Sequence, residues 1–137
     1  MKGTARIALA VAACVLATAV AAARAPAAAS DAVGCTWAPY GDVCIWVWGT
    51  GRYVRHVQVD RNKADYSGIC YYQGHLTVSS GGRVIYSRWS PKYNGCTPLK
   101  AWFDWYPQRN FPNGSTICTA FFERGEVQGK ACETIHS

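Results

Sequence analysis

The stretch VCIWVWGTGRYV, Val43 to Val54, decides how the fold of this chain is interpreted. It is an apolar run with two tryptophans two residues apart, and it closes on a Gly-Thr-Gly turn signal. In a β-strand, side chains two residues apart point to the same face, so Cys44, Trp46 and Trp48 would share one face. The opposite face would carry Val43, Ile45 and Val47. The tryptophan face is then either a platform for a ligand or one half of a hydrophobic core.

Further apolar runs follow this one, separated by clusters of Gly, Pro, Asn and Ser. Val, Ile, Thr, Tyr, Phe and Trp dominate the runs, and helical periodicity is nearly absent. The pattern predicts strands at 43–49, 52–60, 68–78, 83–89, 99–106, 115–123 and 126–135. Residues 30–42 are small, polar and turn-rich, and are expected to form a loosely held N-terminus. About seven short strands of this kind predict an all-β, antiparallel sandwich, which resembles the immunoglobulin and fibronectin type III sandwiches in architecture.

The first 29 residues have the pattern of a secretory signal peptide. Lys2 and Arg6 precede an Ala-rich apolar run, and small-residue cleavage sites end at Ala23 and Ala29. The run is short for a membrane anchor, which needs about 20 apolar residues. We therefore expect a leader over 1–29, with cleavage after Ala29 favoured over Ala23. Residues 30–137 would then form one secreted domain with no membrane attachment.

The charge of the mature chain is only mildly basic. The leader contains three of the 14 Lys and Arg residues and none of the 8 Asp and Glu residues, so the net charge falls from +6 to +3. A weak positive field favours attraction to anionic polymers but requires no nucleic-acid partner. A soluble, charged surface on a monomer explains the composition equally well.

Six cysteines remain after cleavage: Cys35, Cys44, Cys70, Cys96, Cys118 and Cys132. An even number in a short exported chain predicts three disulfides. There is no CxxC pair and the histidines are scattered, so no metal site is expected. A sequential pairing, 35–44, 70–96 and 118–132, is favoured. The main rival joins Cys70 to Cys118 across the two sheets.

The last two predicted strands support the third bridge. A hairpin turn near Gly125 pairs positions whose numbers add to about 250, which places Cys118 opposite Cys132. Cross-strand neighbours lie close enough for a disulfide after a small adjustment. In this register one face is the more apolar and is expected to meet the core. Its residues are Ile117, Phe121, Val127, Ala131 and Ile135.

Aromatic residues supply the candidate binding site. All 18 aromatic residues lie beyond the leader, and the segment AWFDWYP places Trp102, Asp104 and Tyr106 on one strand face. Indole faces beside a carboxylate suit sugar rings, whose CH groups stack while their hydroxyls donate hydrogen bonds. The predicted ligand contacts are Trp48, Trp102, Asp104, Trp105 and Tyr106, with Arg55 and Arg88 as charged helpers. The alternative is a core built from aromatic rings, because only Leu76 and Leu99 remain in a Leu-poor domain; it applies to Trp46 more than to Trp48.

Two other features carry weaker predictions. If the strands that hold Arg52, Arg55 and Arg61 and those that hold Arg83 and Arg88 are neighbours, they form a basic face for an anionic glycan or an acidic protein. The alternative is that these charges protect edge strands from aggregation. The loop 107–114 would present Arg109 and Phe111 as exposed anchors between prolines, as in a protease inhibitor or toxin-like effector.

The sequence gives little support to catalysis. It contains no GxSxG, HExxH, phosphate-loop or dinucleotide motif, and oxidised cysteines leave no thiolate. Only Asp104 lies amid aromatic residues, so a small hydrolase built on it is a remote alternative. The function we expect is a secreted, non-enzymatic binding domain without a cofactor. Its partner would be an extracellular glycan or wall polymer, or else a protein surface.

Overall fold

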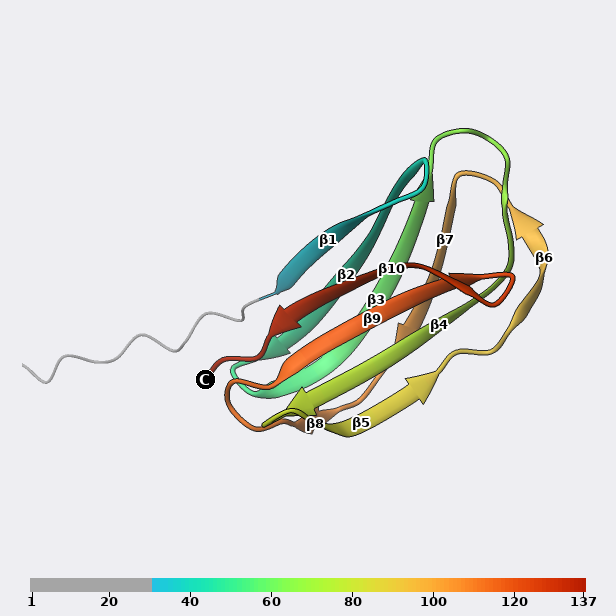
Figure 1. Cartoon of the computed structure of the whole chain (residues 1–137). Coiled ribbons are helices and arrows are strands. Elements are labelled where there is room, and N and C mark those ends of the chain that lie inside the picture. Colours follow the sequence, from blue (N-terminus) through green and yellow to red (C-terminus); the bar gives the residue numbers. More distant parts are fainter. Residues whose placement is uncertain (1–30) are drawn as a thin grey trace, which may run out of the picture.

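The computed structural model describes residues 31–137, and the expected signal peptide, residues 1–29, lies outside them. This part of the chain forms ten antiparallel strands (Figure 1). Their bounds are β1 (Ala32–Ala38), β2 (Gly41–Thr50), β3 (Tyr53–Lys63), β4 (Ile69–Ser80), β5 (Arg83–Trp89), β6 (Tyr93–Thr97), β7 (Lys100–Trp105), β8 (Arg109–Asn110), β9 (Thr116–Glu123) and β10 (Glu126–Thr134). The all-β class is confirmed. In the described residues, no helix long and apolar enough to cross a membrane occurs.

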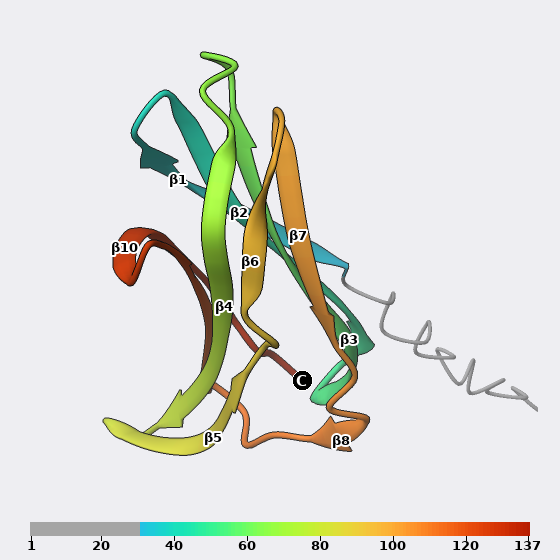
Figure 2. The ribbon, with the colours of Figure 1, turned by 90° about the vertical axis from the view of Figure 1, so that its right-hand side faces the viewer.

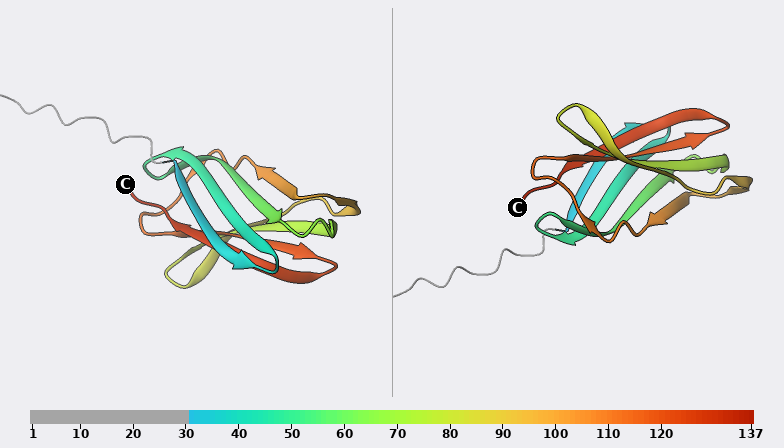
Figure 3. Two further views of the ribbon diagram at one scale, coloured as in Figure 1. Left: turned by 90° about the horizontal axis from the view of Figure 1, so that it is seen from above. Right: turned by 90° about the horizontal axis from the view of Figure 1, so that it is seen from below.

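The strands form two sheets that lie against each other as layers (Figure 3). Sheet A has the order β1-β2-β3-β7, and the short β8 also pairs with β3. Sheet B has the order β10-β9-β4-β5, and β6 also pairs with β4. Immunoglobulin constant domains place their first, second, fourth and fifth strands in one sheet. Sheet A instead holds the first three strands as a meander, so the strand order differs from the expected likeness.

The seven expected strands are present as β2, β3, β4, β5, β7, β9 and β10, and three others were not expected. The prediction of a loose N-terminus over 30–42 is wrong, because β1 pairs with β2 along its whole length. The other two additions are β6 and β8. These short strands pair with the parts of β4 and β3 that β5 and β7 leave unpaired. Edge strands this short carry no clear alternation of apolar and polar residues, so periodicity could not detect them.

The three disulfides have the sequential pairing: Cys35–Cys44, Cys70–Cys96 and Cys118–Cys132. In each bridge the two cysteines are direct cross-strand partners within one sheet, with Cα atoms 4.0 to 4.1 Å apart. The rival that joins the two sheets through Cys70 and Cys118 is therefore wrong. Three intramolecular disulfides are consistent with an oxidising, extracellular environment.

The core between the sheets is mainly aliphatic. Inward-facing Val and Ile residues of β2, β3, β4 and β9 supply most of it, with four aromatic rings: Tyr72, Trp105, Phe111 and Phe121. Ile117, Phe121, Ala131 and Ile135 are buried as expected. Val127 is not, being 58% exposed. A bulge between Val127 and Gly129 shifts the register of β10, which moves Val127 to the opposite face.

One buried ion pair also joins the layers. Arg61 of β3 is fully buried, and its Nε donates a 3.0 Å hydrogen bond to Oε1 of Glu123 at the end of β9. Its other nitrogens donate to the backbone carbonyls of Pro39, Asp42 and Asn62. The expectation that Arg61 belongs to a basic outer face is therefore wrong. A buried guanidinium needs this many acceptors to offset the loss of its hydration.

Candidate functional site

The outer face of sheet A is the candidate functional site. Along β3 the side chains alternate, so Val57 and Val59 enter the core and the polar residues between them face outward. The register places aromatic residues of β2 on one side of this polar column and those of β7 on the other. The outward residues are Trp46 and Trp48 on β2; His56, Gln58, Asp60 and Asn62 on β3; and Lys100, Trp102 and Asp104 on β7, which Tyr106 follows.

Asp60 lies at the centre of this face and is almost completely buried beneath its neighbours. Three side chains donate to its carboxylate: Trp46 Nε1 at 3.0 Å, Gln58 Nε2 at 2.7 Å and Lys100 Nζ at 2.8 Å. These donors come from β2, β3 and β7. A single acceptor thus fixes the orientation of an indole, an amide and an ammonium group before any ligand arrives, which lowers the entropy cost of binding.

Three rings stack across the sheet at one end of the face. The His56 imidazole lies between Trp48, at a centroid distance of 4.3 Å, and Tyr106, at 4.6 Å, and it is within 10° of parallel to both. His56 Nε2 also lies 2.7 Å from Asp104 Oδ1. Both faces of the imidazole are covered, so His56 acts as a spacer that ties the aromatic residues of β2 to those of β7.

Between the aromatic residues lie two hydrogen-bond acceptors with spare capacity. Gln58 and Asp104 are direct cross-strand partners. Gln58 uses its amide nitrogen on Asp60, and Asp104 uses Oδ1 on His56, so Gln58 Oε1 and Asp104 Oδ2 accept nothing from the described residues. Trp46, which is 37% exposed, is the cross-strand partner of Gln58 on β2. Trp102, which is 53% exposed, lies two residues before Asp104 on β7. The arrangement offers apolar ring surface beside paired acceptors for hydroxyl groups.

This geometry answers the question raised by the tryptophan face. The alternative that assigned Trp46 to the core is wrong, and Trp48 also lies on the outer face, partly exposed and stacked 6.2 Å from Trp46. The core does not need these rings, because Val and Ile fill most of it. Of the tryptophans, the structure places one inside the sandwich.

That one is Trp105, and its expected role as a ligand contact is not supported by its position. It is 8% exposed, and its Nε1 has no hydrogen-bond partner among the described residues. The ring lies over Gly74 of β4. Strand alternation explains the result: Trp102 and Asp104 face outward on β7, so Phe103 and Trp105 face the core, as the segment's own periodicity requires.

The expected inhibitory loop 107–114 is not a free loop. Arg109 is exposed and pairs with Val54 through β8, whereas Phe111 is 3% exposed and packs in the core. The prediction that Phe111 is an exposed anchor is therefore wrong. Its backbone N–H donates to the carbonyl of Arg52, which holds this part of the loop against the β2–β3 turn.

The two arginines expected to assist ligand binding lie apart. Arg55 is exposed beside the outer face of sheet A, at the bulge where β2 and β3 shift register. Arg88 lies on β5, at the edge of sheet B. β3 and β5 belong to different sheets, so the expected basic face of neighbouring strands does not form.

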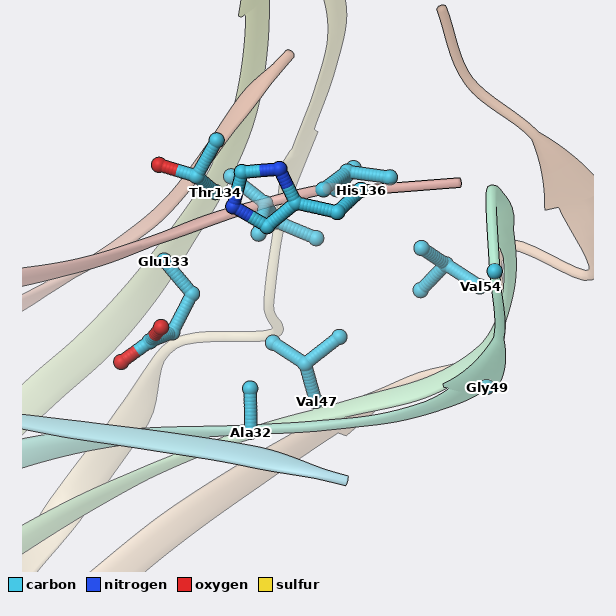
Figure 4. Close-up of a pocket in the computed structure, with 10 residues that line it drawn as sticks. Ala32, Val47, Gly49, Val54, Glu133, Thr134 and His136 are labelled. Carbon is cyan, nitrogen blue, oxygen red and sulfur yellow. The ribbon is translucent and has the colours of Figure 1, made fainter. Parts of the chain in front are cut away.

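Two surface hollows border the candidate site. One, of about 230 Å³, lies at the β2–β3 turn and is lined by Tyr53 and Arg55 among others. The other, of about 190 Å³, lies between β6 and β7, where Tyr93 and Trp102 form part of its wall. Figure 4 shows a third cavity, between β2 and β10 near Val47 and His136. At about 30 Å³ it has room for little more than one water molecule.

Four residues that organise the face were not predicted from the sequence: His56, Gln58, Asp60 and Lys100. The signal was present in β3, where polar residues alternate with valines at a period of two.

Among the described residues, no group of three or more His, Cys, Asp or Glu side chains is arranged to hold a metal ion. None of the family models, curated proteins or solved structures compared with this chain matches it.

Proposed function

We propose that this protein is a secreted, non-catalytic carbohydrate-binding domain, and that the outer face of sheet A binds a neutral polysaccharide chain. The observation that carries the proposal is the pair of spare acceptors, Gln58 Oε1 and Asp104 Oδ2, flanked by the exposed rings of Trp46 and Trp102. A pyranose ring has the same two requirements, a flat apolar face and a rim of hydroxyl donors.

The polar contacts within the β3–β7 part of this face favour a neutral ligand. Lys100 pairs with Asp60, and His56 engages one oxygen of Asp104. An open face of four strands suits an extended chain better than a small molecule that must be buried on most sides. The ordering of the donors around Asp60 supports binding over hydrolysis, because a carboxylate that already accepts three hydrogen bonds is poorly placed to act as an acid or base.

The test is affinity electrophoresis of residues 30–137 in gels that contain cellulose derivatives, xylan, mannan, β-1,3-glucan or soluble chitin. We expect retardation by at least one neutral polymer. Trp46→Ala and Trp102→Ala should each weaken binding about tenfold or more, because truncation of an aromatic anchor typically costs on the order of 2 kcal/mol. The matched control is Trp89→Ala, since Trp89 is 52% exposed, like Trp102, but lies on sheet B.

The outcomes separate the proposal from its rivals. If no neutral polymer retards the protein, or if Trp89→Ala weakens binding as much as Trp102→Ala, the outer face of sheet A is not the glycan site. If Trp46→Ala and Trp102→Ala instead abolish capture of a secreted protein, the face is a protein interface.

A further inference from the structure

A second cluster of charged and aromatic side chains lies away from the outer face of sheet A. Tyr86 of β5 has two guanidinium groups over its ring, Arg88 at 5.0 Å and Arg109 at 5.7 Å from the ring centroid. Arg109 also lies 5.6 Å from the ring of Phe111, which meets Tyr86 edge-on. The two arginines come from different elements, β5 of sheet B and β8 of sheet A, so the fold itself brings them together.

Figure 2 shows β5 and β8 at the same end of the sandwich, where β5 is an edge strand of sheet B and β8 pairs with β3 of sheet A. β8 is held there because it pairs with the start of β3, and Phe111 next to it is buried. Arg52 is close by, since its carbonyl accepts the Phe111 N–H. The position of Arg109 is therefore fixed by backbone pairing and core packing, and does not depend on a mobile loop.

No carboxylate in the described residues neutralises this pair. The ion pairs of the described chain engage His56, Arg61, Lys63 and Lys100, and none engages Arg88 or Arg109. The sequence shows why: no Asp or Glu occurs between Asp65 and Asp104, or between Asp104 and Glu123. β4, β5 and β6 fall entirely in the first of these acid-free segments, and β8 in the second.

Two uncompensated guanidinium groups over one ring are electrostatically unfavourable unless an anion is shared between them. The Tyr86 ring attracts both cations through its π face, which holds them in place. Their N–H groups form forks that match the oxygens of a carboxylate or sulfate ester. An ordered cationic pair of this kind has the features of a site for oxyanions.

We propose that the Arg88–Tyr86–Arg109 cluster is a second binding site, which takes the carboxylate or sulfate groups of an anionic polysaccharide. The chemistry differs from that of the outer face of sheet A, where hydrogen-bond acceptors lie beside exposed rings. This second site does not depend on the first, and either one can exist without the other.

The experiment measures binding of residues 30–137 to dextran sulfate and to polygalacturonate, with neutral dextran as the reference polymer, over a range of NaCl concentrations. The double variant Arg88→Gln/Arg109→Gln should bind dextran sulfate about tenfold more weakly at low salt. The slope of log K against log salt should fall by about one for each guanidinium removed, as counterion release predicts. Polygalacturonate binding shows whether carboxylates are accepted as well as sulfates.

The matched control is Arg124→Gln/Lys130→Gln, which removes the same charge from the β9–β10 hairpin. Arg124 also lies over a tyrosine, 5.3 Å from the ring of Tyr71, and among the described residues no second cation lies over that ring. This variant should lose less than about threefold in affinity, which is the size expected for screened, distant charges. Arg88→Lys/Arg109→Lys keeps the charge but removes the paired N–H donors of the guanidinium groups. Its affinity for dextran sulfate should lie between those of the wild type and of Arg88→Gln/Arg109→Gln.

Equal losses in the two double variants would overturn the proposal, because binding would then follow net charge alone. So would the absence of binding to both anionic polymers. Trp102→Ala provides the separation from the proposed function: it should leave dextran sulfate binding unchanged. If Trp102→Ala abolishes neutral and anionic binding together, there is one site and not two.

Discussion

Gly74 of β4 lies directly beneath the indole of Trp105, and a Cβ added at Gly74 would come within 2.8 Å of Trp105 Cη2 and 3.0 Å of Phe103 Cδ2. The absence of a side chain at Gly74 is what leaves room for the Trp105 indole in the core. Strand alternation then leaves Trp102 on the outer face of β7.

Gly74→Ala is therefore expected to destabilise the domain by about 1–3 kcal/mol, the usual cost of overpacking a core. Thermal unfolding monitored by circular dichroism measures it. Trp105→Phe in the Gly74→Ala background should recover part of the loss, because the smaller ring leaves room for the methyl group. Additive effects of the two substitutions would show that the residues do not compete for the same space.

The buried Arg61–Glu123 pair predicts which of two substitutions, Glu123→Gln or Arg61→Met, lowers the free energy of unfolding more. Glu123→Gln leaves a buried guanidinium without its counter-ion, and we expect a loss of about 3 kcal/mol or more in the free energy of unfolding. Arg61→Met should cost still more, because it also orphans the backbone carbonyls of Pro39, Asp42 and Asn62.

Chemical denaturation measures both variants, and Lys63→Met is the control. Lys63 lies 3.6 Å from the Glu123 carboxylate and donates one hydrogen bond, to the Gly68 carbonyl, so its loss should cost less than the loss of Arg61, which makes four. The reverse order, with Arg61→Met milder than Glu123→Gln, would show that the carbonyl hydrogen bonds contribute little.

Asp60→Asn tests whether the buried carboxylate organises the binding face. Asparagine keeps one acceptor oxygen and turns an NH₂ group toward Trp46, Gln58 or Lys100, so the domain should lose about 1–3 kcal/mol of stability. Binding of the neutral polysaccharide should also weaken at temperatures where the variant is folded, because the donors around position 60 are released.

Asp42→Asn is the matched control for Asp60→Asn. Asp42 lies on the same face and accepts one side-chain hydrogen bond, from Asn62 Nδ2 at 2.7 Å. Affinity electrophoresis of both variants, together with their melting curves, separates the two roles. Comparable losses of binding in both would mean that Asp60 has no special organising function.

The surroundings of His75 predict that the stability of the domain depends on pH. Burial lowers the pKa of His75 below its ordinary value of 6.5, and the nearby positive charge of Lys130 lowers it further. The imidazole is stacked 3.9 Å from Trp89 and lies 2.8 Å from Ser87 Oγ. Because the folded state resists protonation that the unfolded state accepts, stability is full above the unfolded pKa and is lost as pH falls through the folded pKa.

Melting temperatures at pH 5 and pH 7.5 measure this effect. The fall in melting temperature from pH 7.5 to pH 5 should be smaller in His75→Gln than in the wild type. Lys130→Gln should reduce the drop partly, since it removes the second cause of the pKa shift. An unchanged drop in His75→Gln would assign the acid sensitivity to other groups.

Local patterns predicted the parts of this fold that depend on neighbours in the sequence. Cys118 and Cys132 could be paired from their distances to one turn, and the alternation in AWFDWYP separated Trp102 and Asp104 from Trp105. Register errors began where a bulge adds a residue, as at Val127, because nothing in the local pattern marks it. Arg61 could not be predicted inside the core, since its partner Glu123 is 62 residues away. Phe111 became buried through the pairing of β8 with β3, another contact between distant segments.

Because each disulfide closes a ladder within its own sheet, the two layers share no covalent tie beyond the connecting loops among the described residues. Each of the two sheets is cross-linked within itself, and the sheets are held together by the mainly aliphatic core and by the ion pairs of Arg61 and Lys63 with Glu123. Reduction of each disulfide should therefore increase amide hydrogen exchange in the two strands that it joins. Amides at the interface between the sheets should exchange only when the two sheets separate. The β2–β3 hairpin, which carries most of the outer-face array, contains no bridge between its own strands, so its order depends on packing against the opposite layer.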